Sequence, residues 1–125
     1  MKILIVTKAG LSLGLAQRLA LEGHSVEVYS DAFPMVSTGN GIYSISTNLW
    51  KSIQACKFIV SDVGNNKTLY KRAAMYNKPI VGCTEVTDYL NADAVKEYQL
   101  GNKAGVAFPP SELYDDALGL SPVLT

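Results

Sequence analysis

The stretch Lys2–Ser30, KILIVTKAGLSLGLAQRLALEGHSVEVYS, decides the fold of this 125-residue chain. It opens with an unbroken aliphatic run, KILIV, which is typical of a strand that helices cover on both faces. An apolar stripe at helical spacing follows, made of Leu15, Ala16, Leu19 and Ala20. Gly23 is expected to end this helix, and the alternation in VEV predicts a second strand. Two strands joined by a helix are parallel with a right-handed crossover, so the stretch predicts the start of an α/β domain.

The rest of the chain repeats this alternation of apolar runs and helical segments. Strands are predicted over residues 41–46, 58–60 and 79–82, with a last extended piece at 106–108, and helical segments over 47–56, 68–76 and 88–103. Ser12 and Thr47 are expected to cap helices, and Asn77 is expected to end one before Pro79. The pattern predicts a three-layer α/β, Rossmann-like fold, with a mainly parallel sheet of about five strands flanked by helices. Residues 1–110 are expected to form this domain, and residues 111–125 a tail or the start of a linker.

The charges of the chain cancel, with eleven Lys and Arg against eleven Asp and Glu. No global positive field therefore favours nucleic acid or an anionic membrane as a partner, although a local basic patch is compatible with this balance. No apolar run approaches the ~20 residues of a membrane span, and no signal peptide is recognised, so a cytoplasmic location is expected. Cys56 and Cys83 are far apart and belong to no metal-binding motif, which predicts two free thiols.

The candidate site is the rim where the predicted strands end, because α/β sheets bind ligands at the carboxyl ends of their strands. This rim comprises residues 8–14, 30–40, 61–66 and 82–87. The turn 8–14 lacks the Gly-x-Gly-x-x-Gly spacing of a dinucleotide site, since Lys8 and Leu13 stand where the first and third glycines would be.

The same turn predicts a different kind of site, one for a phosphate or a carboxylate. The backbone amides around Gly10, Leu11 and Ser12 precede a helix, and a helix N-terminus favours an anion. Lys8 would add a positive charge. In the alternative interpretation Gly10 only makes the turn, and Gly14 only allows the helix to pack close to the strand.

Three further polar residues at the rim, Asp31, Asp62 and Asn65, are candidates for binding a ligand. Asp31 stands about twenty residues after the turn, where a ribose-binding acid is found in dinucleotide-binding folds. Asp62 and Asn65 suit ribose hydroxyls or an amine, or they form a loop without a ligand. The single histidine, His24, is expected at the opposite end of the sheet, so no catalytic residue and no metal ligand is predicted.

Three stretches of the chain carry a resemblance to a known family. They are MKILIVTKAGLSLGLAQRLA (residues 1–20), FIVSDVGNNKTLYKRAAMYNKPIVGCT (58–84) and DYLNADAVKEYQLGNKAGVAFPP (88–110). In order and spacing they resemble the N-terminal, pre-ATP-grasp domain of ATP-grasp ligases, most closely that of phosphoribosylamine–glycine ligase (glycinamide ribonucleotide synthetase). Of the family's opening loop, Gly-x-Gly-Gly-Arg-Glu-His, only Gly10 is shared, and Ser61-Asp62-Val63 stands where the family has Gly-Pro-Glu.

The resemblance implies a part in ligase chemistry. In that family ATP converts glycine to an acyl phosphate, and an amine then displaces the phosphate. ATP and magnesium are held by an ATP-grasp region, which the resemblance places after about residue 110. This chain is therefore expected to bind no cofactor alone and to be the front domain of a longer or split enzyme, or a stand-alone relic of one.

Three functions are compatible with these observations. The first is the substrate-side domain of a phosphoribosylamine–glycine ligase-like enzyme of purine biosynthesis, without catalysis alone and paired with an ATP-grasp domain or subunit. The second is a stand-alone module that binds a nucleotide or sugar phosphate through residues 8–14 and Asp31. The third is a non-catalytic domain that forms a homodimer through an edge strand or around Trp50. In the first two, the ligand is a small phosphorylated compound or a carboxylate.

Overall fold

The structure is a computed structural model, and the described residues are 1–30, 32 and 39–109. The chain divides into two compact units, Met1–Asp88 and Tyr89–Thr125. Asp31 and the predicted tail at 111–125 lie outside the described residues.

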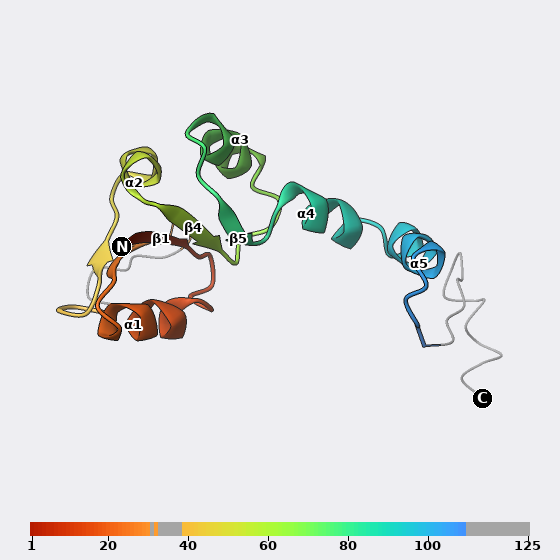
Figure 1. The fold of residues 1–125 in the computed structure, drawn as a ribbon, viewed down its shortest axis with the longest axis horizontal. Coiled ribbons are helices and arrows are strands. Elements are labelled where there is room, and N and C mark those ends of the chain that lie inside the picture. Colours follow the sequence, from red (N-terminus) through yellow and green to blue (C-terminus); the bar gives the residue numbers. More distant parts are fainter. Residues whose placement is uncertain (31, 33–38, 110–125) are drawn as a thin grey trace. The chain divides into compact units, whose positions relative to one another are not determined.

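A five-stranded, all-parallel sheet forms the centre of the first unit (Figure 1). Its strands are β1 (Lys2–Val6), β2 (Ser25–Tyr29), β3 (Ser44–Ile45), β4 (Phe58–Ser61) and β5 (Ile80–Gly82). They lie in the order β3-β2-β1-β4-β5, so the chain winds outward from β1 first on one side and then on the other. The winding direction reverses between β1 and β4, which is where open α/β sheets place their ligands.

Helices cover both faces of this sheet, which confirms the predicted three-layer α/β class (Figure 1). They are α1 (Leu13–Leu21) on one face, and α2 (Leu49–Ala55) and α3 (Lys67–Met75) on the other. The central strand β1 serves both layers, because its side chains alternate. Ile3 and Ile5 belong to the cluster under α1, whereas Leu4 and Val6 belong to the cluster under α2 and α3.

The helix ends lie close to the predicted residues. Gly23 (φ 85°) and Asn77 (φ 50°) take the left-handed conformation after α1 and α3, as predicted. The cap of α2 is Asn48, whose side-chain oxygen accepts the N–H of Lys51 at 3.1 Å, so the prediction of Thr47 as the cap is wrong by one residue.

The apolar stripe of α1 differs from the predicted one. Leu15 is 44% exposed, and its expected place is taken by Leu13, which packs with Ala16, Leu19 and Ala20. Since α1 begins at Leu13, the i, i+3 and i+7 positions counted from it share one face, and Leu15 falls outside that face. The extended piece predicted at residues 106–108 joins no strand.

The predicted helical segment after β5 consists of two helices, α4 (Glu85–Asn91) and α5 (Ala94–Lys103). Asp93 caps α5, because its carboxylate accepts the N–H groups of Val95 and Lys96. Neither helix contains a buried residue. In the second unit the rings of Tyr98 and Phe108 lie 5.3 Å apart between centroids. No helix of the described residues is long and apolar enough to cross a membrane.

Candidate functional site

The candidate site lies at the carboxyl ends of β1 and β4, on the two sides of the point where the sheet reverses its winding. Val6 is paired with Ser61 in the parallel ladder, so the residues that follow each strand start side by side. The turn after β1 and the loop after β4 therefore form one rim, as predicted from the rule that parallel strands end at the same edge of the sheet.

The carboxylate of Asp62 is the centre of this rim. One of its oxygens accepts hydrogen bonds from the hydroxyl of Thr7 at 2.6 Å, the hydroxyl of Ser12 at 2.8 Å and the amide of Ser12 at 3.1 Å. The other oxygen accepts the amide of Lys8 at 3.2 Å. Hydrogen bonds to a charged acceptor are stronger than those between neutral groups, so Asp62 fixes the turn to the loop.

The glycine turn thus already holds an anion, and that anion belongs to the chain itself. Ser12 precedes α1, yet its hydroxyl makes no cap, since it donates to Asp62. The prediction that Ser12 caps α1 by accepting a first-turn N–H is therefore wrong. An external phosphate or carboxylate that used the amide or the hydroxyl of Ser12 would have to displace Asp62 from them.

The glycines of the turn have different roles. Gly10 has φ 75°, a left-handed conformation that favours glycine, and its amide donates to the hydroxyl of Thr7 at 3.1 Å. Gly14 has no atom within 4 Å of the place where a Cβ would be. The interpretation that Gly14 allows close packing of helix and strand is therefore wrong, whereas Gly10 does make the turn.

The other predicted residues of the turn face solvent. Leu11 is 80% exposed, and Lys8 is also exposed. Their roles in ligand binding stay predictions. Sequence reasoning missed Thr7, which is buried and joins Asp62 to the amide of Gly10. The available signal was a hydroxyl residue directly after a buried strand, where a side chain can bond the backbone of the following turn.

Asn65 belongs to a second hydrogen-bonded group, centred on Asp88. It has φ 55°, and its amide donates to the Asp88 carboxylate at 2.7 Å. The hydroxyl of Tyr70 donates to the same carboxylate oxygen at 2.8 Å. Asp88 therefore holds the loop after β4 against α3. Burial, followed by the hydrogen bond to Asp88, raises the pKa of Tyr70 to about 12.

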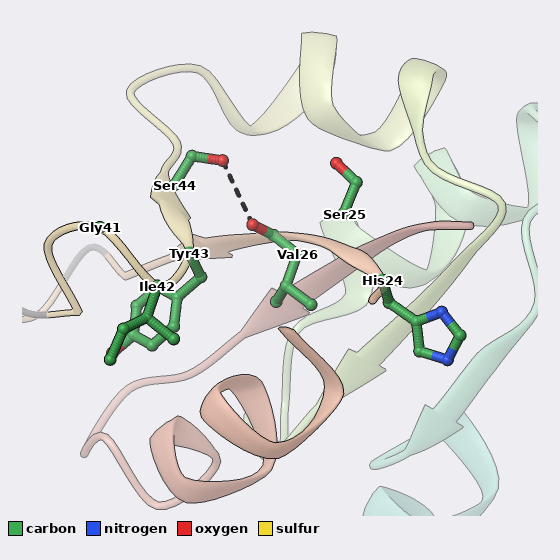
Figure 2. Close-up of a pocket in the computed structure, with 7 residues that line it drawn as sticks. All are labelled: His24, Ser25, Val26, Gly41, Ile42, Tyr43 and Ser44. Carbon is green, nitrogen blue, oxygen red and sulfur yellow. Dashed lines mark hydrogen bonds between the residues drawn. The ribbon is translucent and has the colours of Figure 1, made fainter. Parts of the chain in front are cut away.

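An open pocket of about 320 Å³ lies at the other end of β2 and β3 (Figure 2). Its lining consists of His24, Ser25, Val26, Gly41, Ile42, Tyr43 and Ser44. The hydroxyl of Ser44 donates to the Val26 carbonyl at 3.2 Å, as the dashed line in Figure 2 shows. The sequence indicated only that His24 lies away from the ligand rim. The pocket contains no carboxylate or lysine to orient a ligand.

The described residues offer no complete set of groups for covalent or metal-assisted catalysis. Nδ1 of His24 lies 3.4 Å from the amino nitrogen of Met1, and no serine or cysteine is hydrogen-bonded to this ring. Cys56 and Cys83 are free, as predicted, and burial raises the pKa of the Cys56 thiol. Within residues 1–30, 32 and 39–109, no group of three or more His, Cys, Asp and Glu could hold a metal ion.

Comparison with models of known protein families finds no match, and comparison with curated proteins finds none either.

Proposed function

We propose that this chain is the non-catalytic, substrate-side domain of an ATP-grasp carboxylate–amine ligase similar to phosphoribosylamine–glycine ligase. ATP and magnesium would be bound by an ATP-grasp domain or subunit that works with it. There, ATP would phosphorylate the carboxylate of the first substrate, and the amine of the second would displace the phosphate. This chain would shape the substrate side of the pocket.

One observation supports this proposal above the others. The three stretches that carry the resemblance fold into strands and helices in a regular order along the chain, which is compatible with such a domain. The first forms β1, the glycine turn and α1, the second forms β4, its loop, α3 and β5, and the third forms α4 and α5. The resemblance assigns the chemistry to the ATP-grasp partner, and this chain is proposed to contribute only its side of the pocket.

The contacts of Asp62 favour this role over that of a stand-alone phosphate-binding module. A module that binds phosphate through its glycine turn needs free amides at the helix N-terminus. Here Asp62 accepts the amides of Lys8 and Ser12, and the amide of Gly10 donates to Thr7. These hydrogen bonds hold the turn in one conformation. Such a turn suits a domain that lies beside a substrate held mainly by another part of the enzyme.

The coding sequence beyond codon 125 and the neighbouring genes provide the first test. We expect an ATP-grasp domain in the same frame or in an adjacent gene. Co-expressed with that region, the chain should support ADP release that depends on both a carboxylate and an amine substrate. A stop codon with no ATP-grasp gene nearby would contradict the proposal, as would full ligase activity of the ATP-grasp part without this chain.

The rim supplies a matched pair of variants for the activity assay. Asp62→Ala frees the turn after β1 from the loop after β4, so we expect a raised KM for the substrate that lies against the rim. Arg18→Ala changes the charge on the exposed side of α1, where Arg18 pairs with Glu22 at 2.6 Å, and should leave KM unchanged. Equal KM values for both variants and the unchanged protein would argue against a substrate at this rim.

A further inference from the structure

The layer formed by α2 and α3 concentrates the positive charge of a chain that is neutral as a whole. The segment from Leu49 to Lys78 contains one acid, Asp62, which is engaged at the sheet rim. Its basic residues are Lys51, Lys57, Lys67, Lys71, Arg72 and Lys78. Within the part of the chain that the structure describes, none of these six forms an ion pair. The chain therefore has a local basic surface, although its net charge is zero.

Two contacts join α2 and α3 side by side on this surface. The guanidinium carbon of Arg72 lies 5.2 Å from the ring centroid of Trp50, which is a cation–π distance. The side-chain amide of Gln54 donates to the hydroxyl of Tyr76 at 2.7 Å. Both pairs cross from one helix to the other, so the exposed side chains of the two helices belong to one surface.

The centre of this surface is apolar and aromatic, although it is exposed. Trp50 is 39% exposed and Met75 is 64% exposed. Lys71 precedes Met75 by four residues, so both lie on the same side of α3. Trp, Met and Arg are enriched at the centres of protein interfaces, and charged groups at the rim of an interface steer the partner.

We infer that the α2–α3 face, defined as Trp50, Lys51, Gln54, Lys71, Arg72 and Met75, docks an acidic protein segment that carries aromatic or aliphatic anchors. The cations of the face, which form no ion pair within the described residues, select acidic residues, and the exposed Trp50 and Met75 select the apolar anchors. The face has one exposed tryptophan, covered on one side by Arg72, whereas single-stranded nucleic acid needs successive stacking platforms. This inference uses no residue of the Asp62 rim and is independent of the ligase proposal.

Trp50 makes the inference testable, because it is the only tryptophan and its fluorescence reports on this face alone. The probe is a random copolymer of glutamate and tyrosine, with polyglutamate and oligo(dT) as comparisons and excitation where tyrosine does not absorb. We expect a saturable change in Trp50 emission with the copolymer that weakens as NaCl is added. Charge reversal of both exposed lysines, Lys51→Glu with Lys71→Glu, should weaken binding by about tenfold or more.

Lys103→Glu is the control, because it reverses one charge on an exposed side chain of α5, as each of the two changes in the double variant does on its own side chain. It should bind the copolymer like the unchanged protein, and circular dichroism should show that all variants are folded. Equal binding by the double variant would overturn the inference. If polyglutamate bound as tightly as the copolymer, apolar anchors would contribute nothing to binding, and the inference would be overturned too. If oligo(dT) bound more tightly than the copolymer, the face would be assigned to nucleic acid.

Discussion

The two units of the chain differ in how they use their apolar side chains. In the described part of Met1–Asp88 the strands and helices bury thirteen hydrophobic residues, which lie between Ile3 and Ala73 in the sequence. In the described part of the second unit, residues 89–109, large apolar side chains remain exposed. They are Tyr89, Val95, Leu100 and Val106. The first unit therefore has a core that can drive its folding, whereas residues 89–109 contain no buried hydrophobic residue.

This difference shows that apolar residues at helical spacing do not by themselves produce a core. The sequence from Leu90 to Tyr98 has apolar residues at helical spacing, much as the region of α1 does. Ala16 of α1 is fully buried because β1 and β2 offer it an apolar face, whereas no residue of α5 is buried. Secondary structure can be predicted from such spacing, but burial depends on the neighbouring surface.

The comparison is tested most strongly by the same substitution in both units. Leu69 in α3 is fully buried, and Leu100 in α5 is 43% exposed. Leu69→Ala should lower the free energy of unfolding by about 2–5 kcal/mol, because it leaves a cavity without loss of helix propensity. Leu100→Ala should change it by less than about 0.5 kcal/mol. Urea unfolding followed by circular dichroism measures both, and similar values for the two variants would mean that α5 shares the core.

Asp62→Ala should have the next largest effect, because it removes the acceptor for both Ser12 groups, the Thr7 hydroxyl and the Lys8 amide. We expect a loss of about 1.5–3 kcal/mol in unfolding free energy. Inorganic phosphate should then stabilise the variant more than the unchanged protein, since the freed donors surround a helix N-terminus. The midpoint of thermal unfolding with and without phosphate measures this, and equal shifts in both proteins would contradict it.

The fold was predictable because its signals are local. The aliphatic run of β1, the glycine after α1 and the asparagine after α3 each act through their own backbone or immediate neighbours. The error at the start of α2 is also local. Thr47 and Asn48 are both good caps, and the choice between them depends on which side chain reaches the amide of Lys51.

The position of the rim could be predicted from the sequence, but the hydrogen bonds between its residues could not. The carboxyl-end rule places residues 8–14 and 61–66 at one rim, where the structure has Ser12 and Asp62 in contact, and their part in ligand binding stays a prediction. What it could not give is that Asp62 bonds Ser12, because the two residues are fifty positions apart and meet only when β1 pairs with β4. An acid after one strand and amides after its neighbour are a pair that only the three-dimensional arrangement reveals.

Tyr70 is expected to make the stability of the first unit depend on pH in the alkaline range. Burial, with the hydrogen bond to Asp88, raises its pKa to about 12, whereas a tyrosine in the unfolded chain has a pKa of about 10. The unfolded state thus loses this proton first, so the stabilisation is complete below about pH 10 and is lost as the pH rises toward about 12. Tyr70→Phe should lower the free energy of unfolding by about 0.5–1.5 kcal/mol at neutral pH. In this variant the free energy of unfolding, measured with urea, should also fall less as the pH rises from about 10 to about 12. If it fell as steeply as in the unchanged protein, groups other than Tyr70 would be responsible for the pH dependence.

Replacement of Asp93 is expected to have the smallest effect on the free energy of unfolding of the whole chain. Its carboxylate caps α5, and the hydrogen bond from the Lys96 amide is the main cause of its lowered pKa. The cap should therefore be present above the ordinary pKa of about 3.9 and be lost as the pH falls below it. Asp93→Ala should speed amide hydrogen exchange in α5 and leave the urea midpoint of the first unit where it was, whereas Asp93→Asn should keep most of the protection. A fall in that midpoint would mean that α5 unfolds together with the sheet, because a helix without buried residues cannot otherwise transmit the loss of a cap to a core that it does not share.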